Sequence, residues 1–132
     1  KLGVGYSNLK GRVDTDGDGT VDDDLDGSNI SPDRLNLSAD YVRGPLSARV
    51  QGQYYLSRRF EGQPASADFE GYTIVNALLR YDTGFGAFSL AAQNLLDEYY
   101  VSYDSDTVRT TDNDRFFAGR GRTITLGWDW RF

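Results

Sequence analysis

Residues 14–26 have the composition of a calcium-binding loop, because aspartates alternate with small residues and oxygen is the ligand that Ca²⁺ prefers. The residues spaced to supply ligands are Asp14, Asp16, Asp18, Thr20, Asp22, Asp24 and Asp26. Gly19 stands at the position where such a loop bends sharply. Leu25 replaces the usual bidentate Glu, so Asp24 or Asp26 would have to serve instead. We expect weak calcium binding, with a Kd of about 10⁻⁴–10⁻³ M. The alternative is a hydrated acidic loop tip without a metal.

A second group of candidate site residues is basic and aromatic. Arginine forks suit carboxylates and other anionic groups of a ligand, and tyrosines can stack or hydrogen-bond beside them. The candidates for ligand contact are Arg58, Arg59, Tyr99, Tyr103, Arg115 and Arg120. The alternative is that these arginines pair with loop aspartates or with lipopolysaccharide phosphates.

The composition of the 132 residues excludes several classes of protein. No Cys and no His are present, which removes thiol and imidazole chemistry, common zinc sites and disulfides, so we expect no enzyme. The formal net charge of −6 argues against a nucleic-acid partner. The sequence has no long apolar run that would form a transmembrane helix. The chain begins without Met, and we expect it to be part of a longer protein.

Hydrophobic and polar residues alternate with a period of two, which predicts β-strands. The predicted strands cover residues 2–6, 35–41, 46–57, 72–81, 87–103 and 123–132. On this alternation, one face of the sheet carries Val50, Leu56, Ile124, Leu126 and Trp128. The opposite face carries Arg49, Gln51, Gln53, Thr125 and Asp129.

The connections between these strands alternate in length. Short turns are expected at about 43–45 and 82–86, and long polar loops at about 14–33, 61–71 and 104–120. Short turns on one side and long loops on the other are typical of an outer-membrane β-barrel. Aromatic residues near the strand ends of the apolar face favour lipid outside the sheet, and mid-strand charges favour a hydrated lumen inside. A soluble β-sandwich is the alternative, since its strands alternate in the same way.

Three stretches, taken together and in this order, resemble the C-terminal region of TonB-dependent outer-membrane receptors. They are Gly71-Tyr72-Thr73-Ile74-Val75, Asn94-Leu95-Leu96-Asp97-Glu98-Tyr99-Tyr100 and Ala118-Gly119-Arg120-Gly121-Arg122. The resemblance covers most of residues 1–132 and is weaker before Ser31.

This resemblance implies an all-β fold: an antiparallel meander of about six strands from the C-terminal part of a 22-stranded barrel with a plugged lumen. It implies a receptor in the bacterial outer membrane that transports a ferric siderophore or a similar nutrient. The implied partners are outer-membrane lipid and the protein TonB, which would act through an N-terminal region missing from this sequence. Six strands are fewer than the roughly eight that a membrane barrel needs, so we do not expect the chain to close alone.

The C-terminal strand resembles the signal that the barrel-assembly machinery recognises by strand addition. The residues that carry this resemblance are Thr125, Gly127, Trp130 and Phe132. The alternative is a last strand that happens to alternate and to end in an aromatic residue.

The runner-up function is a secreted or surface-attached calcium-binding β-sheet module with a structural or adhesive role. A receptor segment should depend on detergent for solubility, whereas a secreted module should not.

Overall fold

The computed structural model describes residues 1–25, 30–61, 68–103, 105 and 117–131. The strands within these ranges are β1 (Leu2–Ser7), β2 (Arg12–Val13), β3 (Asp23–Asp24), β4 (Arg34–Arg43), β5 (Leu46–Tyr55), β6 (Tyr72–Thr83), β7 (Gly86–Gln93) and β8 (Thr123–Trp130). No helix in the described part of the chain is long and apolar enough to cross a membrane.

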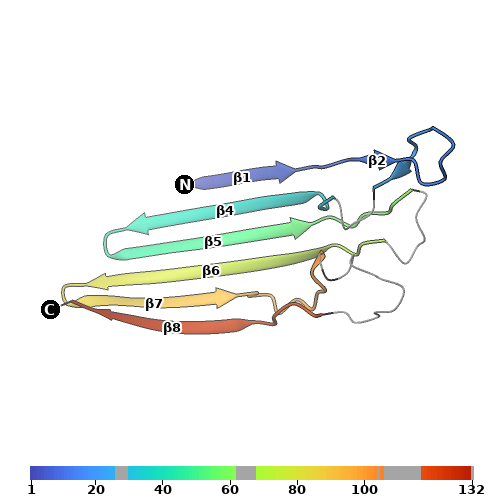
Figure 1. Cartoon of the computed structure of the whole chain (residues 1–132). Coiled ribbons are helices and arrows are strands. Elements are labelled where there is room, and N and C mark those ends of the chain that lie inside the picture. Colours follow the sequence, from blue (N-terminus) through green and yellow to red (C-terminus); the bar gives the residue numbers. More distant parts are fainter. Residues whose placement is uncertain (26–29, 62–67, 104, 106–116, 132) are drawn as a thin grey trace.

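Six of the strands form one open antiparallel sheet in the order β1-β4-β5-β6-β7-β8, so the prediction of a six-stranded all-β meander is confirmed. Figure 1 shows the short turns at one end of this sheet and the long connections at the other. The remaining strands, β2 and β3, pair with each other inside the first long connection. Two-residue turns join β4 to β5 and β6 to β7, and Gly44 in the first of them has the positive φ of 56° that glycine tolerates best.

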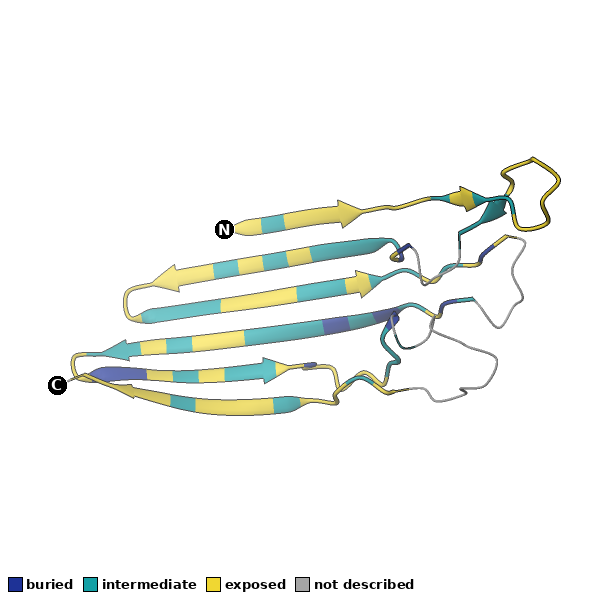
Figure 2. Cartoon of the chain, viewed as in Figure 1, coloured by how far each residue is buried: buried dark blue, intermediate teal, exposed yellow. Residues whose placement is uncertain are grey.

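The register places most of the apolar residues of the six strands on one face. One row across the sheet is Leu2, Ala39, Val50, Ala77, Ala92 and Ile124, and the next row toward the turns is Tyr41, Ala48, Leu79, Leu90 and Leu126. We call this surface the apolar face. Its large side chains are exposed, among them Val50, Ile124 and Leu126, the last at 80%. Figure 2 marks exposed residues along the strands in yellow.

The opposite surface, which we call the polar face, carries amides, hydroxyls and charges. One row across β1 to β6 is Gly3, Ser38, Gln51 and Asn76, and on the same face Gln93 of β7 lies opposite Thr123 of β8. In the next row Asp40 lies opposite Arg49 on the neighbouring strand and the two form an ion pair. Asp40 and Arg49 are therefore paired across neighbouring strands of this face.

A charge network covers the polar face near the short turns. Arg80 on β6 lies 2.9 Å from Asp129 on β8 and 3.2 Å from Asp82, and Arg131 lies 3.3 Å from Asp82. The register puts Ala87 of β7 between Asp82 and Asp129, and Ala87 is fully buried. The long side chain of Arg80 thus links two strands that are not neighbours.

The hydrophobic core lies at the other end of the sheet, among the long connections. Its buried members are Ile30, Phe60, Phe69, Tyr72, Ile74 and Tyr103. Tyr72 and Ile74 belong to the polar face of β6, and the other members come from three different connections, so these connections pack over that face. Figure 2 shows the buried residues of β6 at this end.

The strand predicted over residues 87–103 is wrong beyond Gln93. Asn94 has a φ of 48° and Asp97 a φ of 58°, left-handed conformations that end a strand. The strand predicted over 46–57 likewise ends at Tyr55, where Leu56 begins the next connection and donates its N–H to the carbonyl of Asp33.

Candidate functional site

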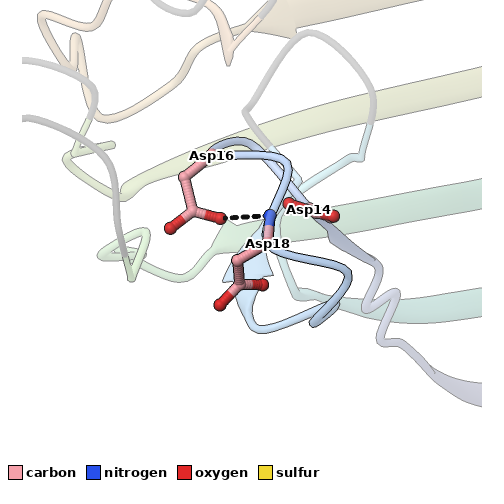
Figure 3. Close-up of side chains that lie close together, drawn as sticks. All are labelled: Asp14, Asp16 and Asp18. Carbon is pink, nitrogen blue, oxygen red and sulfur yellow. Dashed lines mark hydrogen bonds between the residues drawn. The ribbon is translucent and has the colours of Figure 1, made fainter.

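The first candidate site is the tip of the β2–β3 hairpin, shown in Figure 3. Among the described residues, the side chains of Asp14, Asp16 and Asp18 place carboxylate oxygens within 4.8 Å of one another. Gly17 and Gly19 turn the chain between them with φ values of 76° and 89°. Three carboxylates at this spacing are suited to a hard divalent cation.

Backbone N–H groups hold the carboxylates of this tip. Asp14 accepts hydrogen bonds from the N–H groups of Gly17 (2.6 Å) and Gly19 (2.9 Å), and these bonds lower its pKa from the ordinary value. Because Asp14 stays ionised to a lower pH than an ordinary aspartate, its contribution to cation binding should be lost only as the pH falls through that lowered value.

The other predicted calcium ligands lie differently. Asp22 is exposed and does not belong to the group of three carboxylates. The backbone of Asp24 lies opposite Arg12 in the β2–β3 ladder. Its carboxylate accepts the N–H of Glu61 and therefore faces the connection after β5. The N–H of Thr20 donates to Asp18. Asp26 lies outside the described residues.

We predict that Ca²⁺ binds to this tip with a Kd of about 10⁻⁴–10⁻³ M and that the double variant D16A/D18A abolishes the binding. Mg²⁺ should compete poorly, since it demands octahedral geometry and keeps its waters. Calorimetry on the intact protein measures both. D22A is the matched control, because Asp22 lies outside the three-carboxylate group. Equal calcium heats for D16A/D18A and the unaltered protein would leave only an acidic loop.

The candidate ligand-contact residues are dispersed. Arg59 and Tyr99 are exposed, with 81% exposure for Tyr99, and Arg59 lies 3.9 Å from Asp68. Arg58 donates a hydrogen bond to the carbonyl of Leu9. Tyr103 is buried in the core and donates its hydroxyl to the carbonyl of Ile30, so the structure gives it a packing role. Of the two remaining candidates, Arg120 lines a cavity on the polar face, and Arg115 lies outside the described residues.

That cavity has a volume of about 530 Å³ and lies over the polar face of β5, β6 and β7. Gln51, Gln53, Asn76 and Gln93 supply amides to its lining, together with Arg49 and Arg120. Such a lining can hydrogen-bond a polar ligand. These amides were not predicted as site residues, because in the sequence they are only the polar residues of alternating strands.

A buried asparagine joins the connection after β7 to the start of β8. Asn94 is 3% exposed, accepts the N–H of Glu98 and donates to the carbonyls of Glu98 (2.9 Å) and Arg120 (3.1 Å). Asp97 accepts the N–H of Arg122 at 2.8 Å. We call residues 94–100 and 119–122, held together by these bonds, the strap.

The strap is anchored by a stack of rings over the polar face. The ring of Tyr72 lies 4.5 Å from Tyr55 on one side and 4.5 Å from Tyr100 of the strap on the other, measured between centroids. A Cβ atom at Gly119 would lie 2.0 Å from the Tyr100 ring, so only glycine fits there. In the sequence, only the spacing of the tyrosines hints at this stack.

The residues of the predicted assembly signal divide between the two faces of β8. Thr125 and Gly127 pair with Ala91 and Ser89 on the polar face, and Trp130 lies opposite Gly86 on the apolar face. Trp130 belongs to a cluster of rings with Phe85 and Trp128 at the short-turn end. Phe132 lies outside the described residues.

Comparisons of the chain with protein-family models, curated proteins and solved structures gave no match.

Proposed function

We propose that this chain forms part of the wall of an outer-membrane β-barrel, and that the barrel is a TonB-dependent receptor for a ferric siderophore or a similar nutrient. The observation that carries the proposal is the two-sided sheet. Its apolar face is continuous across six strands and exposed, while the opposite face holds the paired charges and the amides.

Lipid is the environment that suits the apolar face. In water, exposed apolar surface is unfavourable by about 25 cal/mol per Å², and large contiguous patches mark a covered surface. The four strands from β4 to β7 are 8–12 residues long, close to the roughly 9–11 residues that cross a bilayer as a tilted strand.

Aromatic side chains lie at both ends of the apolar face, as in the girdles of membrane barrels. At the long-loop end, Tyr6 and Tyr54 lie on either side of Leu35 in one row across the strands. At the short-turn end, Trp128 and Trp130 cluster with Phe85. The short turns would then face the periplasm and the long connections the cell exterior. Further strands would have to pair with the open edges of β1 and β8, because about eight strands are the minimum for closure.

The assignment to the receptor family is supported by the resemblance of residues 71–75, 94–100 and 118–122. Two of these stretches are hydrogen-bonded to each other through Asn94 and Asp97, and Tyr72 of the third stacks on Tyr100. The three stretches therefore act as one structural unit, which gives their joint occurrence a physical reason.

Site-directed spin labelling of the full-length protein in bilayers tests the membrane proposal. This chain has no Cys, so single cysteines can be placed at successive positions of β8. Labels at residues 124, 126 and 128 should collide with oxygen dissolved in lipid, and labels at 125, 127 and 129 with a water-soluble nickel chelate. Nickel accessibility on both faces would contradict the proposal.

A second candidate, a secreted calcium-binding β-sheet module, is favoured by the three clustered carboxylates of the hairpin tip. Such a module would have to cover the apolar face with protein. Solubility without detergent as a monodisperse species, with calcium-dependent stability, would support this candidate against the membrane barrel.

We predict that replacing Gly127 with valine, or deleting Phe132, reduces insertion of the full receptor without reducing its synthesis. Quantitative immunoblots of outer-membrane and whole-cell fractions measure both. A Cβ at Gly127 would lie 2.4 Å from the hydroxyl oxygen of Ser89, so packing offers a competing explanation. The double variant G127V/S89G removes that contact. Continued poor insertion of the double variant would support the assembly signal, and restored insertion would assign the effect to packing.

A further inference from the structure

The last two strands, β7 and β8, are joined by the long connection of residues 94–122, whereas two-residue turns join β4 to β5 and β6 to β7. A two-residue turn fixes which residues of its two strands face each other, and a connection of this length does not. The pairing of β8 with β7 therefore needs another determinant.

Hydrophobic alternation supplies only part of that determinant. A shift of β8 by one residue would turn Leu126 and Trp128 to the polar face, so alternation excludes it. A shift by two residues keeps every side chain on its own face. It places Leu126 opposite Phe88 or Ala92 instead of Leu90, and both alternatives are apolar. Alternation therefore leaves the two-residue shifts open.

The strap links β6 to the residues just before β8. The N–H of Asn94 donates to the side-chain carbonyl of Asn76 on β6 at 3.0 Å. The N–H of Leu95 donates to the carbonyl of Val75 at 2.7 Å. The side chain of Asn94 donates in turn to the carbonyl of Arg120. The strap is thus fixed to the sheet before β8 begins.

One contact of the strap opposes a shift in the first direction. Gly119 lies against the ring of Tyr100, where a Cβ atom would be 2.0 Å from the ring, and its N–H donates to the Tyr100 carbonyl at 2.7 Å. A shift that places Thr125 opposite Ser89 would bring Phe117 into the position of Gly119. The side chain of Phe117 cannot fit there, because even a methyl group would overlap the ring.

A second contact opposes the two-residue shift in the other direction. This shift keeps a glycine against the Tyr100 ring, namely Gly121, but it puts Ile124 in the place of Arg122. Arg122 donates its N–H to the carboxylate of Asp97 at 2.8 Å, and its guanidinium lies 3.7 Å from the same carboxylate. The shift would therefore replace an ion pair with an apolar side chain beside a charge.

We propose that the strap is a register lock, which selects one pairing of β8 with β7 among those that alternation allows. The contact of Gly119 with Tyr100 blocks a shift in one direction. The Asp97–Arg122 pair opposes a shift in the other direction, and Asn94 fixes both contacts relative to β6. The lock acts within the sheet, so the inference does not depend on what covers the apolar face.

Disulfide formation in the folded full-length protein tests the proposal, with T125C held constant and its partner varied. A91C gives the native pair, because Ala91 lies opposite Thr125. Q93C gives the forward pair and S89C the backward pair, which report the two shifts. Diagonal neighbours lie about 7–8 Å apart between Cα atoms, beyond the roughly 7 Å that a disulfide spans, so each pair reports its own register. The chain has no Cys of its own to compete.

The variant N94G/D97G removes both side chains, and glycine accepts the positive φ of both positions. The yield of the forward pair relative to the native pair should rise at least about tenfold, the equivalent of about one net hydrogen bond. The backward pair should not rise, since Tyr100 still blocks that shift. D97G alone keeps the bonds of Asn94 and should raise the forward pair about threefold, which decides the case if the double variant does not fold.

Two controls separate the lock from other causes. L96G adds a glycine to the same segment and removes an exposed side chain. D129N removes another contact specific to this register, the ion pair with Arg80. Both should leave the ratio of forward to native pair within about twofold. The inference would be overturned by an unchanged ratio in N94G/D97G, by an equal rise in either control, or by an equal rise of the backward pair.

Discussion

Arginine at position 126 should destabilise the full receptor in a bilayer by about 2–4 kcal/mol, whereas arginine at position 125 should cost much less. Leu126 is central in β8 and belongs to the apolar face, where it pairs with Leu90. A charge there would lie near the bilayer midplane, far from water. Thr125 is the next residue and lies on the polar face opposite Ala91, where a guanidinium would remain hydrated.

Reversible folding into bilayers under denaturant measures both free energies of unfolding. I124R is a second test of the apolar face, because Ile124 shares that face in the row of Val50 and Ala77, and its cost should also exceed that of arginine at position 125. Equal costs at positions 125 and 126 would contradict the assignment of the faces. A large loss of unfolding free energy for arginine at position 125 alone would show that the two faces are assigned the wrong way round.

The variant N94A should lower the free energy of unfolding by about 2–4 kcal/mol. The change removes all three hydrogen bonds of a buried side chain, and the N–H and carbonyl of Glu98 and the carbonyl of Arg120 lose this partner. It also puts alanine at a φ of 48°, which asparagine tolerates better. Denaturant titration of the full receptor in bilayers measures the loss.

Two further variants test this prediction about the strap. N94D keeps the acceptor for the N–H of Glu98 and the tolerance of positive φ, so its loss should be smaller than that of N94A. Y99A removes an exposed side chain of the same segment and should change stability by less than about 0.5 kcal/mol. Similar losses for N94A and Y99A would show that the buried hydrogen bonds contribute little.

The sheet could be predicted from sequence because its determinants are local. Alternation with a period of two places Val50 and Leu126 on one face and Arg49 and Thr125 on the other, and the register of the structure agrees. The glycines of the short turns mark where adjacent strands reverse. The clustering of Asp14, Asp16 and Asp18 is likewise a consequence of spacing within a few residues.

The features that sequence could not predict depend on contacts between distant residues. The strand after Gly86 ends at Gln93 because Asn94 bonds to Arg120, which is 26 residues away. Asp24 is drawn toward Glu61, 37 residues away, and Tyr103 donates to Ile30, 73 residues away. Sequence spacing contains no sign of such partners, so the contacts of Asp24 and Tyr103 with neighbouring connections could not be predicted.

The network of Arg80 and Asp129 bears on how freely β7 can vary in sequence. β7 presents only alanine and serine to the polar face between these charges, at Ala87 and Ser89. A longer side chain at either position would stand in the path of the guanidinium. The small residues on this face of β7 are therefore required by the Arg80–Asp129 ion pair, which crosses above the strand. We expect mutational scanning to find β7 less tolerant of bulk on this face than β5, whose cross-strand ion pair joins direct neighbours.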